Sequence, residues 1–108
     1  MVTVYKNFVI VAAGSSDFFS RGFDMNGGNT VDLSATATFV NQDVLLFVEF
    51  GNDLQNWSGA TGIGTLDAAT RFSADSVGAV AARYFRLKIR IAGAGTLVVS
   101  VDAETSSQ

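Results

Sequence analysis

The residues of this chain that could do chemistry are few. The 108-residue sequence contains no histidine and no cysteine, which excludes metal sites built on either residue and thiolate nucleophiles. Carboxylates, lysine, tyrosine, serine and threonine remain as candidate acids, bases and nucleophiles. Hydrolysis by paired carboxylates needs two acids fixed across a cleft, and no spacing in the sequence selects such a pair. We therefore expect a protein that is not an enzyme.

Oxygen ligands for a cation are present but scattered. Asp17, Asp24, Asp53 and Asp67 could donate oxygens to calcium, yet none of them stands in the dense Asp-x-Asp-x-Asp-Gly spacing of a calcium loop. Solvated acids in turns are the simpler interpretation. The sequence therefore predicts no metal and no cofactor.

The strict alternation of residues 84–91 is the clearest pattern in the chain. Side chains of a β-strand point to opposite faces with a period of two, so this segment has one apolar and one basic face. A turn at residues 92–95 leads into another strand-like segment, which predicts a β-hairpin. The apolar face consists of Phe85, Leu87, Ile89 and Ile91, and the other face of Tyr84, Arg86, Lys88 and Arg90.

The basic face has two interpretations. Four of the seven basic residues lie within residues 83–90. Acids on neighbouring strands could pair with them and stabilise the sheet modestly. The functional alternative is a docking surface for an acidic partner. The four residues are Arg83, Arg86, Lys88 and Arg90.

Strand patterns recur along the rest of the chain. Residues 2–12 and 17–25 are rich in β-branched and aromatic residues. Residues 30–39 alternate, which predicts that Val31, Leu33, Ala35, Ala37 and Phe39 point inward and that Thr30 points outward.

The middle and the end of the chain are less regular. Residues 44–50 are apolar on both faces apart from Glu49, so this strand is either covered on both sides or shows Leu45 and Phe47 to a partner. Residues 51–66 are expected to form a long connection or the tip of a hairpin around Trp57. Residues 68–82 should be irregular with a short strand, and the last five residues should be frayed.

Short strands between glycine, asparagine and serine turns, with no convincing long helix, predict an all-β fold. We expect an antiparallel β-sandwich or jelly roll of about eight strands, in a single domain spanning residues 1–108. Hydrophobic residues make up 48% of the chain and charged residues 16%, so apolar surface should remain for a partner. Proline is absent, which leaves open sheet edges without one of their usual guards.

Charge and hydropathy limit the compartments and partners. The net charge of −3 gives no electrostatic support for binding nucleic acid. No apolar run approaches the ~18 to 20 residues that cross a bilayer, and no secretory signal is visible at the start. We expect synthesis in a host cytoplasm without a signal peptide, and no membrane partner.

Two segments resemble the discoidin-like jelly rolls. In that family a strand runs into a small-Asn-Asp-x-x-Asn-Trp turn, which residues 48–57 match through Asn52, Asp53, Asn56 and Trp57. A later strand of the family reads Arg-Tyr-x-Arg-Leu-x-Ile, as residues 83–89 do. The resemblance covers the second half of the chain and implies a sandwich in which Trp57 packs the turn against the sheet. It also implies that Arg86 braces the loops at one end.

Two functions are compatible with these patterns. In composition the chain resembles the small decoration, cement or fibre-base proteins of tailed-phage virions, which implies a structural protein of a virion. Such a protein would form a homo-oligomer and bind a capsid or other virion protein through Leu45, Phe47, Arg83, Arg86, Lys88 and Arg90. The alternative is a discoidin-like carbohydrate-binding module, in which Asn52, Asp53, Asn56 and Trp57 bind a sugar.

Overall fold

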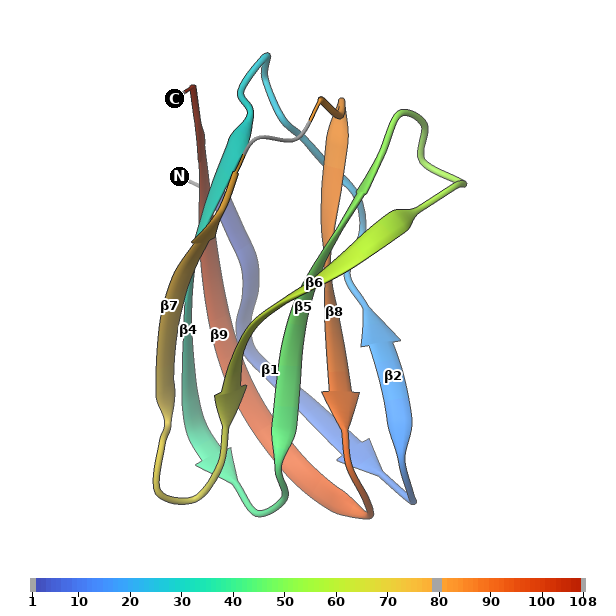
Figure 1. Cartoon of the computed structure of the whole chain (residues 1–108). Coiled ribbons are helices and arrows are strands. Elements are labelled where there is room, and N and C mark those ends of the chain that lie inside the picture. Colours follow the sequence, from blue (N-terminus) through green and yellow to red (C-terminus); the bar gives the residue numbers. More distant parts are fainter. Residues whose placement is uncertain (1, 79–80, 108) are drawn as a thin grey trace.

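Two antiparallel sheets pack face to face in the computed structural model, which describes residues 2–78 and 81–107 (Figure 1). Within these residues there are nine strands and no helix, and hence no helix able to cross a membrane. Sheet A has the strand order β1 (Val2–Ala12), β9 (Gly95–Ser106), β4 (Thr30–Val40) and β7 (Phe72–Val77). Sheet B has the order β2 (Ser16–Phe19), β8 (Tyr84–Ile91), β5 (Val44–Gly51) and β6 (Ser58–Leu66), with β3 (Phe23–Asp24) also paired to β8.

The connections are those of a jelly roll. Both β2 and β3 pair with β8, so they act as one interrupted strand and bring the effective number to eight in the described chain. Apart from that interruption, only the β5–β6 connection stays within one sheet, and each of the others crosses the sandwich. Two interleaved four-stranded sheets linked in this way form the double Greek key of a jelly roll. The predicted fold class is confirmed.

The core lies between the sheets and is built by alternation. The inward side chains of β8 are at most 1% exposed, as the sequence predicts. Those of β9 face them from sheet A and are fully buried, which fills the space between the sheets with branched aliphatic groups. These residues are Phe85, Leu87, Ile89 and Ile91 of β8, and Leu97, Val99 and Val101 of β9.

The predicted hairpin of residues 84–102 is wrong. β8 lies in sheet B and β9 in sheet A, so the short segment 92–94 crosses the sandwich instead of joining neighbouring strands. Alternation determines which side chains of a strand are buried, but it does not determine which sheet the strand joins. The consequence for function is large, because the outward residues of β8 and β9 lie on opposite outer faces.

Two orientation predictions for β4 are also wrong. Thr38 and Phe39 together oppose Val98, and this β-bulge turns Phe39 outward, where it is 46% exposed. Thr30 is buried instead of exposed. Elsewhere in β4 the predicted inward residues are in the core.

Two predicted irregular regions are strands. β6 covers residues 58–66, which were expected to belong to a connection, and pairs with β5. β9 continues to Ser106, where Thr30 is its partner, so the chain is not frayed through residue 106. Residue 108 of the predicted frayed end lies outside the described residues. The short strand expected within residues 68–82 is β7.

Candidate interaction surface

The outer face of sheet B gathers cations and aromatic rings. β8 contributes three basic residues, and the strands on either side contribute two acids, two phenylalanines and one leucine. Directly paired residues share a face, so all eight side chains lie on the side away from the core. We call this surface the cationic-aromatic face. Its residues are Asp17, Phe19, Leu45, Phe47, Glu49, Arg86, Lys88 and Arg90.

Ion pairs join β8 to the neighbouring strand on each side. Arg86 Nε donates to Glu49 Oε1 of β5 at 2.7 Å, and these two side chains are 22% and 13% exposed. On the other side Arg90 binds Asp17 of β2 in a bidentate manner, with Nε to Oδ1 at 2.8 Å and Nη2 to Oδ2 at 3.2 Å. Lys88 Nζ lies 3.8 Å from Asp17 Oδ2. The acid-paired interpretation is therefore confirmed for Arg86, Lys88 and Arg90 but not for Arg83, and this face has a surplus of one positive charge.

The Arg90–Asp17 pair is reflected in the proton affinities of both groups. The hydrogen bond from Arg90 lowers the pKa of Asp17 below its ordinary value, and the charges of Arg90 and Lys88 add to the effect. The same contact raises the pKa of Arg90. The pair therefore stays ionised across the neutral range.

Aromatic rings lie against the cations. The Arg86 guanidinium is 4.2 Å from the centre of the Phe19 ring and 4.8 Å from that of Trp57. Phe47 has Lys88 Nζ at 5.4 Å and the Arg90 guanidinium at 5.6 Å from its ring centre. Each distance is within the range of a cation–π interaction. These contacts restrict the long, flexible side chains of Arg86, Lys88 and Arg90.

Apolar groups remain exposed between the charges. Phe19, Lys88 and Phe47 form one row across three strands, in which Phe19 is 46% exposed. Leu45, in the adjacent row with Arg90, is 37% exposed. A Cβ atom at Gly62 would lie 3.7 Å from the Phe47 ring, so the ring extends over β6 where that strand has no side chain. Residues 44–50 are thus not covered on their outer side, where Leu45 and Phe47 lie; that a partner binds there stays a prediction.

Arg83 lies apart from the other predicted partner-binding residues. It precedes β8, and its guanidinium is 5.4 Å from the centre of the Tyr84 ring. Its side chain is exposed, and within the described chain it forms no ion pair. It adds an uncompensated positive charge beyond the Arg86 end of the face.

The predicted sugar-binding residues form a self-contained turn between β5 and β6. Asp53 Oδ1 accepts hydrogen bonds from the backbone N–H groups of Gln55 and Asn56, and Asp53 Oδ2 accepts one from the Asn56 amide. These bonds lower the pKa of Asp53. Asn52 is exposed at the start of the same turn.

Trp57 packs the turn against the sandwich. A Cβ atom at Gly22 would lie 2.9 Å from the indole ring, and one at Gly51 would lie 3.3 Å from it, so both glycines leave room for the ring. The Arg86 guanidinium stacks on the indole from the sheet side. The expected packing of Trp57 against the sheet is observed, and the discoidin-like relationship itself stays a prediction.

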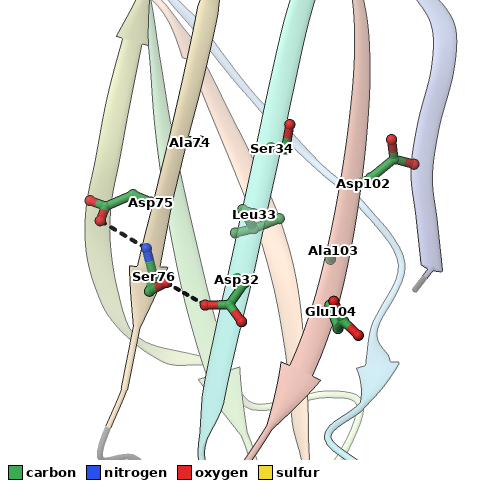
Figure 2. A pocket seen from close by; sticks show the side chains of 9 residues that line it. All are labelled: Asp32, Leu33, Ser34, Ala74, Asp75, Ser76, Asp102, Ala103 and Glu104. Atoms are coloured by element: carbon green, nitrogen blue, oxygen red, sulfur yellow. Dashed lines mark hydrogen bonds between the residues drawn. The ribbon is translucent and has the colours of Figure 1, made fainter.

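The outer face of sheet A carries the opposite charge at one end. Asp32 and Glu104 are directly paired on β4 and β9, and Asp102 lies on the same side of β9 (Figure 2). Ser76 Oγ of β7 donates to Asp32, and Thr3 Oγ1 of β1 donates to Asp102. Within the described residues no ion pair joins these carboxylates to a cation. Like charges placed directly opposite each other destabilise a sheet, so a partner cation would relieve this arrangement.

The other end of the same face is apolar. Val9, Val98 and Phe39 form a row across β1, β9 and β4, and Val11 continues it along β1. Val9 is 58% exposed. We call the outer side of sheet A, with this row and the carboxylates of Asp32, Asp102 and Glu104, the acidic-aliphatic face.

Sequence reasoning found the cations of sheet B and missed their partners. Asp17, Phe19 and Glu49 were not predicted as interface residues, although each is the outward residue of a strand beside β8. Glu49 did carry a signal, since it is the single charge in the otherwise apolar residues 44–50. The row of Val9, Val98 and Phe39 was also missed, because Phe39 was expected to point inward.

Comparison with known proteins assigns no family. No protein-family model matches the chain, and no curated protein has a significantly similar sequence. Among the described residues, no group of three carboxylates is arranged to hold a metal ion. The functional proposal therefore depends on the geometry of the two outer faces.

Proposed function

We propose that this protein is a non-enzymatic structural subunit that assembles through the cationic-aromatic face of sheet B, in the manner of a decoration, cement or fibre-base protein of a phage particle. The observation that carries the proposal is the row of Phe19, Lys88 and Phe47. Two aromatic rings are held in place there by cations and remain partly exposed. Interfaces are enriched in rigid aromatic and arginine side chains of this kind.

Sheet faces are better placed than sheet edges to form the contact. Edge strand β1 has irregular pairing between Tyr5 and Phe8, with Asn7 at a φ of 48°. Edge strand β7 carries Asp75 opposite the buried Leu33, which places a charge on the core side of the edge. Bulges and such charges guard edges against pairing with another chain. Despite the absence of proline, these two edges are protected, which favours association through the outer faces.

The sugar-binding alternative gains little from the geometry. The carboxylate of Asp53 and the amide of Asn56 are engaged within their own turn, and one side of Trp57 is covered by Arg86. A sugar would have to displace contacts that hold the turn together. A glycan array with the wild-type protein and Trp57→Ala tests this alternative directly.

A matched pair of variants tests the assembly proposal. Leu45→Ser changes an exposed leucine on the face, whereas Leu54→Ser makes the same change at a leucine that is 59% exposed in the β5–β6 turn. We expect an oligomer by sedimentation velocity at micromolar concentration for the wild type and Leu54→Ser, and a shift towards monomer for Leu45→Ser. A wild-type protein that stays monomeric at all accessible concentrations, and does not bind virus particles, would refute the proposal.

The virion part of the proposal needs its own measurement. Particles purified by density gradient from cultures that carry the sequence should contain the chain in stoichiometric amounts by mass spectrometry. Its absence from such particles would restrict the proposal to a structural oligomer outside virions.

A further inference from the structure

We infer that the partner of the cationic-aromatic face is the acidic-aliphatic face of a second copy of this chain, so that subunits stack sheet B on sheet A in a head-to-tail manner. This inference rests on the proposed assembly function and names the receiving surface. Each molecule presents both complementary surfaces, because β8 and β9 lie in different sheets.

Charge and hydrophobicity match between the two faces. The cationic-aromatic face has a surplus positive charge, and the unpaired Arg83 adds to it at one end. The acidic-aliphatic face has three carboxylates without a cationic partner among the described residues. Exposed rings on one face correspond to exposed valines on the other. Such complementarity orients an association and suppresses wrong pairings.

The spacing along the strands also matches. On sheet A, Asp102 and Glu104 are four and six residues from Val98, or about 13 and 20 Å at the strand rise of about 3.3 Å per residue. On sheet B, Arg83 is five residues from Lys88, or about 17 Å by the same rise. If Phe19 and Phe47 rest on the row of Val9, Val98 and Phe39, the backbone of Arg83, just before β8, therefore falls at the level of these carboxylates.

The symmetry of the contact has a structural consequence. Two different faces meet, so every bound subunit leaves one free face of each kind. A heterologous contact of this type closes into a ring if its rotation allows and otherwise grows as a filament. An isologous dimer, in which sheet B packs on sheet B, would instead bring the surplus positive charges together.

Mixing two variants, each with substitutions on a different face, tests the inference. The first double variant, Val9→Lys/Glu104→Lys, reverses charge and adds cations on sheet A at exposed positions. The second, Phe19→Ser/Arg83→Ser, removes a ring and a cation from sheet B without adding charges that could pair with the first variant. We expect each variant alone to be monomeric by sedimentation velocity and an equimolar mixture to form a dimer that grows no further. Matched controls are Asp43→Lys and Arg71→Glu, exposed positions in loops outside both faces, and they should assemble like the wild type.

The other outcomes separate the two proposals. If the sheet A variant still self-associates, or if the mixture stays monomeric while the wild type assembles, the head-to-tail inference is wrong and the assembly function stands. If the wild type itself is monomeric, the head-to-tail inference is wrong, and the assembly function is refuted as well if the wild type also does not bind virus particles. Should a double variant not fold by circular dichroism, dilution of wild-type protein followed by NMR decides. Signals of Val9 and Phe19 must then shift together, and a shift confined to one face overturns the inference.

Discussion

Removal of the Arg86 guanidinium is the most informative single perturbation of sheet B. This group binds Glu49 at 2.7 Å and lies against the rings of Phe19 and Trp57, so it joins β8, β5, β2 and the β5–β6 turn. A hydrogen bond to a charged group contributes about 1.5 to 3 kcal/mol. Each cation–π contact adds about 0.5 to 1 kcal/mol at an exposed site. We expect Arg86→Met to lower the free energy of unfolding by about 3 kcal/mol, since Glu49 is also left with little solvent.

A conservative substitution and a double-mutant cycle separate the contributions to the loss of stability predicted for Arg86→Met. Arg86→Lys keeps the charge but loses the planar group that stacks on two rings, and we expect it to lower the free energy of unfolding by about 1 to 2 kcal/mol. Glu49→Gln in the wild-type and Arg86→Met backgrounds should give a coupling energy of about 1 to 2 kcal/mol.

Urea denaturation followed by circular dichroism is the appropriate assay, because Trp57 fluorescence would respond to the loss of its neighbour directly. A loss of about 3 kcal/mol corresponds to a fall in Tm of about 12 °C or more for a chain of this size. Arg83→Met is the control and should change stability by less than about 0.5 kcal/mol. If Arg86→Met were no more destabilising than this control, or if Arg86→Met and Glu49→Gln were additive, the bracing role of Arg86 would be refuted.

Three further predictions concern smaller contacts. Asp17 should titrate at a lower pH than an ordinary aspartate in NMR, because Arg90 lowers the pKa of Asp17. The ionised Asp17 should stabilise the fold above its unfolded-state pKa, and this stabilisation should be lost as pH falls through its folded-state pKa. Arg90→Gln should raise the titration midpoint of Asp17 and weaken the fall in stability at acid pH. An unchanged midpoint would contradict the pairing of Arg90 with Asp17. Ser20→Ala should lower the free energy of unfolding, measured in urea, by about 1 to 3 kcal/mol, because Ser20 Oγ accepts a hydrogen bond from the buried Leu87 N–H. The control Ser15→Ala changes an exposed serine and should leave the free energy of unfolding unchanged. Gly51→Ala should destabilise by about 1 to 3 kcal/mol in thermal melts, because its Cβ would clash with the Asn56 carbonyl oxygen, whereas the Cβ of Gly14→Ala meets nothing within 4 Å. Equal melting temperatures of the two variants would show that the turn adjusts freely.

The alternation of apolar and polar residues predicted the fold well, because alternate side chains of a strand in a sandwich are buried in the core. Residues 84–91 are the clear case, with every apolar side chain buried and every charged one outward. The failures have physical causes that alternation does not contain. The bulge at Thr38 and Phe39 adds one residue to β4, which reverses the side on which Phe39 lies. β6 was missed because its glycine and threonine residues have little apolar content, and its pairing with β5 supplies the order instead.

For a related reason, the sequence predicted the cations of the candidate site but not the acids that pair with them. A single strand shows its own charges, so Arg86, Lys88 and Arg90 were visible in the sequence. Their partners Asp17 and Glu49 are separated from them by dozens of residues, and strand order decides the pairing. The error on the hairpin hid the second face as well, since residues 96–102 were expected in the same sheet as the cations and Glu104 in a frayed end.

The central place of β9 in sheet A bears on how the chain reaches its native state during synthesis. β9 is the partner of both β1 and β4, so these two strands have no direct pairing with each other. Until residues 95–106 leave the ribosome, both strands expose backbone groups that their native neighbour will occupy. Such non-local pairing folds slowly, in roughly milliseconds to seconds, and translation adds only about 5 to 20 residues per second. Sheet A can therefore close only once β9 has been made, and until then β1 and β4 lack the strand that lies between them in the native sheet.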